Sequence, residues 1–364
     1  MKILHCINSP SIGGIERLVI DLAVSQKERG SDVSIMLGTL EGQYYEYLIK
    51  QDIELLESNI KNGFDFSIKT YNKVLAVFNT FDIIHLHNFS VIRNASALRS
   101  KAKVIYTIHG LSKGIRKENR IKYFIREALK GFFLNRVDVI VANSNYTLAL
   151  AKQHYSLKTI RSLTILNGVK RYNIIANHKE SSISSPEIFT VGLVSRFTNR
   201  KRIDRLLKAF RLFLDSGNKG KLILVGDGET FSEMNQLVKD LVIEDFVEFV
   251  GYKNNVADYY KEFDVLVFPS EKEPFGLVAV EAYFNGKPVL AFNDSGGLKE
   301  VVEPLEPKNI VNNESELAER LAYFSLNIDS IKENAKERIE YAKMNFSNEK
   351  METDYFELYQ ELVQ

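Results

Sequence analysis

The chain of 364 residues contains one cysteine and lacks any long hydrophobic run. A single cysteine excludes an internal disulfide framework and indicates a reducing compartment. No stretch approaches the roughly 18 uncharged apolar residues that a membrane span needs, and the apolar run after Met1-Lys2 is too short for a signal peptide. We therefore expect a protein that is made and kept in the cytosol.

Net charge is also nearly absent, at +1 for the whole chain. This value argues against a protein that binds polyanions over its entire surface. Residues 1–180, however, carry 26 Lys and Arg against 15 Asp and Glu, whereas residues 181–364 carry 22 against 32. The net charges of +11 and −10 predict halves with different partners. Because no nucleic-acid-binding module or base-stacking platform accompanies the basic half, no nucleic acid is expected.

Two cofactor patterns are missing. A nicotinamide site needs G-x-G-x-x-G after the first strand, and residues 9–17 contain only the pair Gly13-Gly14. His85 and His87 would share one face of a strand and raise the question of a metal. A third ligand at suitable spacing is missing, and one cysteine offers no zinc pattern. We predict neither a metal nor an organic cofactor.

Short apolar runs alternate with amphipathic segments along the whole chain. Continuously apolar runs are typical of buried parallel strands, and the apolar residues of 202–214 repeat at helical spacing. This alternation predicts an α/β protein with doubly wound sheets. Strands are expected at residues 2–7, 32–37, 83–87, 104–109, 137–142, 189–194, 221–225, 247–250, 265–268 and 288–292.

A domain boundary is expected within residues 170–186. This segment loses its periodicity and becomes rich in Ser and Asn, as linkers do, and the sign of the charge changes there. We predict an N-terminal domain over 1–170 and a C-terminal domain over 186–346.

The strongest local signal lies at residues 268–282. A strand ends there in a loop that leads through Gly276 into a helix, so that free backbone N–H groups would face phosphate or sugar oxygens at the carboxyl end of the strand. Glu273 and Glu281 bracket this turn with seven residues between them. Taken alone, Glu273 would be interpreted as a solvated loop acid or an N-cap partner, and Glu281 as a surface acid of the helix.

This spacing resembles the E-x7-E motif of retaining glycosyltransferases of family 4, which have the GT-B fold. Segments that resemble other landmarks of that family follow in the same order at residues 13–17, 82–88, 107–110, 142–144, 167–169, 192–201, 222–228, 250–252, 286–289 and 295–302. The resemblance covers nearly the whole chain. It implies two Rossmann-like domains that face each other across a cleft, with the helix at 347–364 packing back on the first domain.

The resemblance assigns roles in donor binding to the second domain. Arg196 and Lys201 would stabilise the departing diphosphate, since fixed cations are strong stabilisers of a charged leaving group. Glu281 would accept hydrogen bonds from the ribose hydroxyls, and Glu273 would bind hydroxyls of the transferred sugar. The backbone that supports the sugar and the distal phosphate would belong to Phe275, Gly276 and Leu277. A basic helix start is the alternative explanation for Arg196 and Lys201.

In the first domain the resemblance points to Gly13, Gly14 and His109. The amides of the two glycines would approach the phosphates, although the pair could form a simple turn. His109 closes a predicted strand at its carboxyl end, where open α/β sheets bind ligands. By resemblance it would face the donor sugar, where it would stabilise developing positive charge or position a hydroxyl. A purely structural cap is the alternative.

A basic amphipathic segment in the first half suggests a membrane surface. Residues 113–136 contain eight Lys and Arg and two Glu, and their apolar residues repeat at helical spacing. Lys122, Arg126 and Lys130 fall on another face. Such a helix can lie on an anionic membrane. An ordinary helix with its apolar side on the sheet and its basic side in water is the alternative.

Together these features predict a metal-independent retaining glycosyltransferase. It would move a hexose or N-acetylhexosamine from a UDP- or GDP-sugar to a hydroxyl of a glycan acceptor. By family analogy the acceptor is lipid-linked, and the pathway is the synthesis of a bacterial surface polysaccharide such as O-antigen (lipopolysaccharide) or capsule, on the inner face of the cytoplasmic membrane. The alternatives are a GT-B nucleotide-sugar epimerase and a non-catalytic nucleotide-sugar-binding module.

Overall fold

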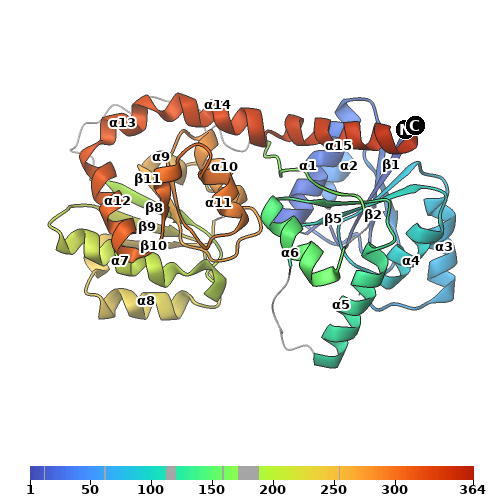
Figure 1. The fold of residues 1–364 in the computed structure, drawn as a ribbon, viewed down its shortest axis with the longest axis horizontal. Helices are drawn as coiled ribbons and strands as arrows, with labels where there is room; N and C mark the ends of the chain where they lie inside the picture. Colours follow the sequence, from blue (N-terminus) through green and yellow to red (C-terminus); the bar gives the residue numbers. More distant parts are fainter. Residues whose placement is uncertain (12, 61–62, 112–119, 158–159, 171–187, 254) are drawn as a thin grey trace. The chain divides into compact units, whose positions relative to one another are not determined.

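The computed structural model describes residues 1–364 except 12, 61–62, 112–119, 158–159, 171–187 and 254. It divides into two compact units, which are Met1–Gly168 together with Asn348–Gln364 (unit 1) and Val169–Ser347 (unit 2). Each unit is built on one parallel β-sheet (Figure 1). The last helix of the chain therefore belongs to unit 1, although it follows unit 2 in the sequence.

The sheet of unit 1 has the strand order β3-β2-β1-β4-β5-β6-β7. The strands are β1 (Lys2–Ile7), β2 (Asp32–Leu37), β3 (Glu54–Glu57), β4 (Ile83–Leu86), β5 (Lys103–Ile108), β6 (Val139–Ala142) and β7 (Ser162–Thr164). The helices are α1 (Gly14–Glu28), α2 (Tyr45–Lys50), α3 (Ile68–Phe78), α4 (Val91–Arg99), α5 (Arg120–Leu134), α6 (Asn145–Tyr155) and α15 (Asn348–Val363). The direction of strand addition reverses between β1 and β4, so ligands are expected beyond their carboxyl ends.

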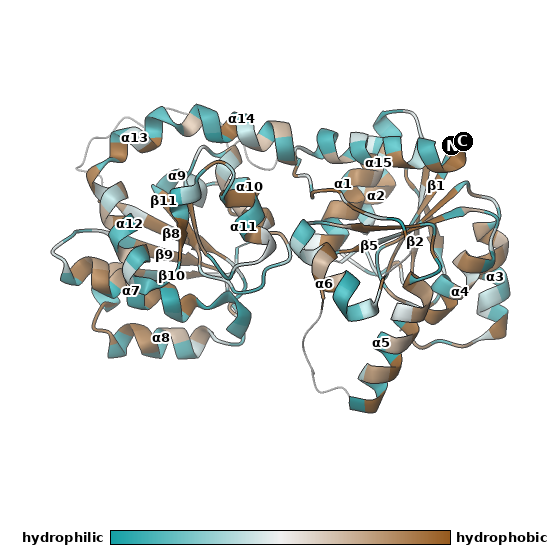
Figure 2. Cartoon of the chain, in the orientation of Figure 1, coloured by the Kyte–Doolittle hydropathy of each residue, from teal (hydrophilic) through white to brown (hydrophobic). Residues whose placement is uncertain are grey.

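Local sequence explains where the helices of unit 1 begin. The side chains of Ser67, Ser90 and Ser144 cap α3, α4 and α6 by accepting hydrogen bonds from backbone amides three residues on. Apolar strand residues form the buried core (Figure 2). Cys6 lies in this core as predicted, and burial raises the pKa of its thiol to about 12.

The sheet of unit 2 has the order β10-β9-β8-β11-β12-β13. The strands are β8 (Thr190–Val194), β9 (Lys221–Val225), β10 (Val247–Gly251), β11 (Val265–Phe268), β12 (Val289–Phe292) and β13 (Ile310–Val311). The helices are α7 (Ile203–Asp215), α8 (Phe231–Asp240), α9 (Tyr259–Glu262), α10 (Leu277–Phe284), α11 (Gly297–Val302), α12 (Glu314–Leu326), α13 (Ile328–Glu333) and α14 (Ala335–Phe346). Here the order reverses between β8 and β11.

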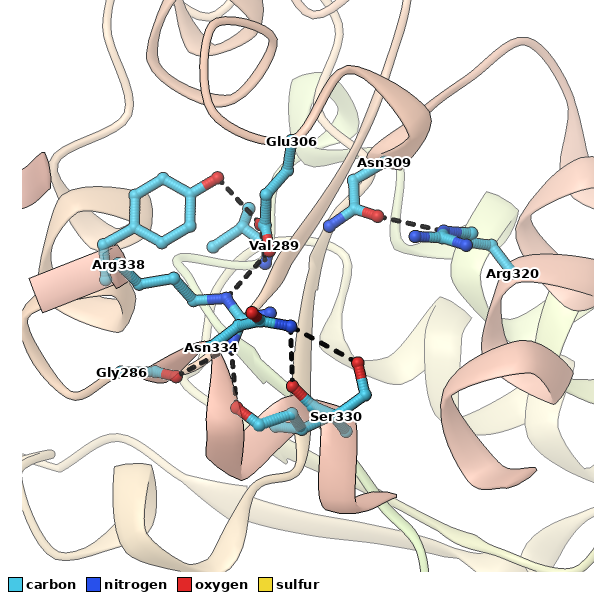
Figure 3. A network of polar contacts seen from close by, with 10 residues as sticks. Gly286, Val289, Glu306, Asn309, Arg320, Ser330, Asn334 and Arg338 are labelled. Atoms are coloured by element: carbon cyan, nitrogen blue, oxygen red, sulfur yellow. Dashed lines mark hydrogen bonds and ion pairs between the residues drawn. The ribbon is translucent and has the colours of Figure 1, made fainter. Parts of the chain in front are cut away.

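A buried ion pair fixes α14 to the rest of unit 2 (Figure 3). Arg338 Nε donates to Glu306 Oε1 at 2.8 Å. The other carboxylate oxygen of Glu306 accepts a hydrogen bond from Tyr283 Oη at 3.0 Å. Arg338 also donates to the carbonyl oxygens of Gly286 and Ile331. The pair therefore joins α14 to the end of α10, to the turn before β12 and to α13.

Candidate functional site

The loops at the carboxyl ends of adjacent strands in unit 2 are hydrogen-bonded to one another. After β11, the amide of Glu271 donates to the carbonyl oxygen of Arg200, which follows β8, at 3.0 Å. The amide of Glu273 donates to the carbonyl oxygen of Ser295, which follows β12, at 2.9 Å. The predicted site residues of these loops thus lie at the reversal point of the sheet, where α/β proteins bind ligands.

Glu273 and Lys201 form an ion pair in these loops. Lys201 Nζ lies 2.9 Å from Glu273 Oε2, and Arg200 Nη2 lies 3.9 Å from Glu273 Oε1. The side chains of Glu273 and Lys201 are 13% and 19% exposed. Lys201 ends a short 3₁₀-helix, Asn199–Lys201. Two residues that are 72 positions apart in the chain therefore place a carboxylate and an ammonium group together at a half-buried position.

Arg196, by contrast, is not brought into this pair. It follows β8 by two residues and its side chain is exposed. Among the residues that the structure describes, no carboxylate forms an ion pair with it. The structure thus leaves an uncompensated guanidinium at the carboxyl end of the first strand of unit 2.

Gly276 shapes the start of α10. Its φ of +100° lies in the left-handed region, and a Cβ built on it would lie 2.7 Å from Leu298 Cδ1. No side chain caps α10, and no described residue accepts a hydrogen bond from the amides of Leu277 and Val278. These amides and the helix dipole favour an anion. Phe275 is buried and packs edge-on against Phe346 at 5.9 Å.

Replacing Gly276 by alanine is expected to lower the free energy of unfolding by about 2–3 kcal/mol, through backbone strain and the clash with Leu298. Gly217→Ala is a matched control, because Gly217 also has a positive φ (+81°) but a Cβ there meets nothing within 4 Å. We expect about 1–2 kcal/mol for the control in urea unfolding. Equal losses for the two variants would show that Leu298 does not constrain Gly276.

Glu281 lies in the second turn of α10. Its Oε2 accepts a hydrogen bond at 2.9 Å from the hydroxyl of Tyr260, which is buried in α9. Tyr260 thus holds one carboxylate oxygen of the second motif glutamate. Tyr260 could not be identified from the sequence, because it lies 21 residues before Glu281 in a short helix and belongs to none of the motifs.

Gly13 and Gly14 lie at the start of α1, the helix that follows β1 in the chain. Gly13 is the N-cap residue, its backbone is extended (φ −167°), and no side chain caps the helix. A Cβ at Gly13 would lie 2.2 Å from Glu16 Oε2, so a larger residue would have to displace Glu16. Neither a left-handed backbone nor a contact with other backbone requires glycine here, because the atoms that a Cβ would meet are the end of the Glu16 side chain.

His109 follows β5 directly and is partly exposed. Its Nε2 lies 3.1 Å from Nδ1 of His87. Desolvation, with a smaller contribution from the charge of Lys130, lowers the pKa of His109 to about 4. The imidazole is therefore neutral at pH 7 and can accept a hydrogen bond but carries no positive charge.

The expectation that His85 and His87 lack a third imidazole partner is wrong. His5 pairs with His85 in the register of β1 and β4, and one nitrogen from each of His5, His85 and His87 lies within 4.8 Å of the others. Spacing along the chain could not reveal this cluster, because His5 lies 80 residues before His85. Every ring nitrogen of the three already has a hydrogen-bond partner, so a metal would have to displace some of these bonds.

Helix α5 exposes much of its apolar side. An ordinary helix of the first domain, the alternative to a membrane-binding helix, would have packed that side on the sheet. Ile121, Phe124, Ile125 and Phe132 are between 49% and 69% exposed. Lys130 does not lie on a solvated basic face, because its ammonium group contacts the rings of Tyr106 and Tyr155 and burial lowers its pKa. Residues 113–119 of the predicted basic segment lie outside the described residues. Within the described chain, no helix has both the length and the hydropathy of a membrane span.

Comparison with known protein families identifies the class. The family described as Glycosyltransferase Family 4 matches residues 12–171, and the family described as Glycosyl transferases group 1 matches residues 175–344. The two matches occur in the order expected for this class and together span most of both units. The chain belongs to the group 1 glycosyltransferases of family 4, and it is a glycosyltransferase.

Individual relatives agree with this assignment. N-acetyl-alpha-D-glucosaminyl L-malate synthase of Bacillus anthracis is 27% identical over 310 residues, which is 81% of this chain and 79% of the relative. A 41.2 kDa protein in the cps region of Klebsiella pneumoniae is 28% identical over 297 residues, covering 78% and 79%. The crystal structure of Anabaena HepE in complex with UDP has a TM-score of 0.77 at 21% identity and covers 99% of this chain and 100% of HepE. The predicted GT-B class is thereby confirmed.

Proposed function

We propose that this enzyme transfers a sugar from a nucleotide-sugar donor to a hydroxyl of a glycan acceptor with retention of anomeric configuration. The observation that carries the proposal is the Lys201–Glu273 pair beside the uncapped start of α10. Cations and free amides suit the diphosphate, and carboxylates suit sugar hydroxyls. The UDP complex of HepE supports a UDP-sugar as donor, with GDP-sugars as the alternative.

Each group would have a separate task in donor binding. The amides of Leu277 and Val278 and the side chains of Arg196 and Lys201 would hold the diphosphate. Glu281, oriented by Tyr260, would accept the ribose hydroxyls, and Glu273 would accept hydroxyls of the transferred sugar. For unit 1 we propose that the amides of Gly13 and Gly14 approach phosphate and that His109 binds a sugar hydroxyl.

The reaction would proceed through an oxocarbenium-like state. The bond between the anomeric carbon and the diphosphate oxygen breaks, the acceptor hydroxyl attacks the same face of the sugar, and its proton passes to the departing diphosphate oxygen. Arg196, Lys201 and the start of α10 would stabilise the negative charge that develops on the diphosphate, which is the step where fixed positive charge has its largest effect. We do not assign Glu273 as a covalent nucleophile. None of these proposed steps requires a metal ion.

The acceptor would be lipid-linked, in the assembly of a surface polysaccharide on the inner face of the cytoplasmic membrane. The exposed apolar side of α5, flanked by the exposed cations Arg120, Lys122 and Arg136, supports contact with an anionic membrane. The relative in the cps region of Klebsiella pneumoniae supports the polysaccharide role.

Removing apolar groups from α5 is expected to weaken membrane binding. The double variant Ile121→Ser with Phe124→Ser should bind vesicles that contain phosphatidylglycerol at least about tenfold more weakly, because each buried apolar side chain contributes about 1.5–3 kcal/mol. The matched control is Ile68→Ser on α3, a residue of similar exposure. Co-sedimentation measures binding, which should weaken with salt. Equal binding of the double variant and wild type would contradict the proposal.

The function itself is tested with a panel of UDP- and GDP-sugars. At a concentration of 100 times Kd, a bound donor stabilises the fold by about 2.7 kcal/mol, so one sugar of the panel should raise Tm clearly. Conversion of that donor to an isomer in the absence of acceptor would favour an epimerase. Binding without transfer to any glycan acceptor would favour a non-catalytic binding module.

A further inference from the structure

Three hydrogen bonds connect α1 to His109 through the interior of unit 1. Nε2 of His5 lies 2.8 Å from Oε1 of Gln26. Nδ1 of His5 lies 3.0 Å from Nε2 of His87, and Nδ1 of His87 lies 3.1 Å from Nε2 of His109. Gln26, His5 and His87 are buried, and His109 is partly exposed. The row therefore runs from a buried amide to the one histidine of the three that solvent reaches.

Strand register produces this row. His5 pairs with His85, and His85 pairs with Ile105, in the three adjacent parallel strands β1, β4 and β5. Side chains two positions apart share a face of a strand. His87 lies two residues beyond His85, and His109 lies four residues beyond Ile105. The imidazoles of His5, His87 and His109 thus advance toward the carboxyl edge of the sheet.

The amide at one end determines the proton positions along the row. All four imidazoles are neutral at pH 7, because desolvation lowers the pKa of His5 and His109 to about 4 and that of His85 and His87 well below the usual value. A neutral imidazole has one N–H donor and one acceptor nitrogen. Since Gln26 Oε1 can only accept, His5 carries its proton on Nε2 and accepts at Nδ1. His87 must then donate from Nε2 to Nδ1 of His5 and accept at its own Nδ1. His109 must in turn donate from Nε2 to Nδ1 of His87.

A second set of contacts holds the row in place. His85 bonds to the hydroxyls of Tyr359 and Thr107, both at 2.6 Å, and Thr107 bonds to the hydroxyl of Tyr355 at 3.0 Å. The ring of His85 packs against that of His87 with a centroid distance of 4.0 Å. Tyr355 and Tyr359 belong to α15, so the last helix of the chain supports the histidine row.

We propose that Gln26, His5 and His87 are positioning residues that fix His109 in the Nε2–H tautomer, so that its Nδ1 always accepts a hydrogen bond from a sugar hydroxyl. No described residue bonds to Nδ1 of His109. The inference rests on the proposed function, which places a sugar at His109. An unprotonated Nδ1 of His109 favours ligands that present a hydroxyl donor to it and disfavours ligands that present only an acceptor.

Nuclear magnetic resonance of the full chain with ¹⁵N-labelled histidine tests the tautomer directly. Two-bond proton–nitrogen correlations distinguish the protonated from the bare ring nitrogen, and His109→Gln assigns the signals. We expect a protonated Nε2 and a bare Nδ1 in wild type and in Gln26→Glu, which keeps an acceptor. In Gln26→Met the acceptor is lost, and the His109 signals should shift toward a mixture of both tautomers.

Several results would overturn the inference. A wild-type His109 protonated at Nδ1 would mean that Gln26 presents its amide nitrogen to His5. Identical His109 signals in wild type and Gln26→Met would show that the row does not determine the tautomer. If Gln26→Met does not fold, His5→Phe breaks the row at another point and is expected to give the same mixture. Zinc titration that shifts His5, His85 and His87 together would identify a metal site in place of the row.

The kcat of the Gln26 variants provides a second test, because a Gln26 that only stabilised the fold would not change kcat in parallel with the tautomer of His109. Gln26→Met should lower kcat in proportion to the fraction of His109 that leaves the Nε2–H tautomer, about twofold for an equal mixture, and Gln26→Glu should restore it. An unchanged kcat in Gln26→Met would overturn the positioning role. A chain that shows the expected tautomers but binds no nucleotide sugar would contradict the proposed function and not the histidine row.

Discussion

Replacing Lys201 by methionine is expected to reduce kcat by about 10²–10³-fold, the usual effect of removing one preorganised group that stabilises charge in the transition state. The ammonium group of Lys201 is half-buried beside Glu273 and the start of α10, so water screens it only partly. Among the described residues, the cation that would remain near the Glu273 carboxylate is the guanidinium of Arg200, at 3.9 Å. The same change should also remove a cation from the departing diphosphate.

Steady-state transfer kinetics with the donor found in the nucleotide-sugar panel measure this effect. Lys208→Met is a suitable control, because Lys208 pairs with Asp204 on the exposed surface of α7 and has no proposed role in donor binding. The control should retain wild-type kcat. A loss of less than about threefold in Lys201→Met would contradict the assignment of Lys201 to the leaving group.

Replacing Arg338 by methionine is expected to lower the free energy of unfolding by about 3–5 kcal/mol. The change leaves the half-buried Glu306 carboxylate without its largely desolvated cation, which costs more than the loss of an exposed pair. It also removes the donor to the carbonyl oxygens of Gly286 and Ile331. Part of this loss should return in the double variant Arg338→Met with Glu306→Gln, because no buried charge then remains unpaired.

Urea unfolding followed by circular dichroism measures the stability of these variants. Lys343→Met removes the partner of Glu340 on the exposed side of the same helix and should change the stability by less than about 1 kcal/mol. If Arg338→Met and Lys343→Met lost equal stability, the buried pair could not be what holds α14 in place.

Most of the fold followed from the hydrophobic pattern, whereas short edge elements did not. The ten predicted strands all occur within two residues of the expected bounds. β3, β7 and β13 were missed, and β7 and β13 have only three and two residues. β3 and β7 are also only half-buried or exposed, so they lack the continuous apolar run that identified the central strands.

In the candidate site, features set by spacing along one segment could be predicted, whereas contacts that depend on the order of strands in the sheet could not. The positions of Glu273 and Glu281 around the start of α10 could be predicted, because they depend on spacing along one loop and helix. The contact of Glu273 with Lys201 requires β8 and β11 to be neighbours, and the row of His5 and His87 requires β1 beside β4. Helical periodicity identified the two faces of α5 but could not determine which face is exposed.

The most direct test of the account is the binding of uridine diphosphate and UDP-sugars to wild type and to Glu281→Gln and Lys201→Met, measured by isothermal titration calorimetry. We expect one binding site per chain in wild type, weaker binding of nucleotide in Glu281→Gln, and weaker binding of the diphosphate in Lys201→Met. GDP and GDP-sugars provide the comparison for base specificity. Binding of a nucleotide that neither substitution weakens would contradict the central claim that unit 2 holds the donor between its motif glutamate and this lysine.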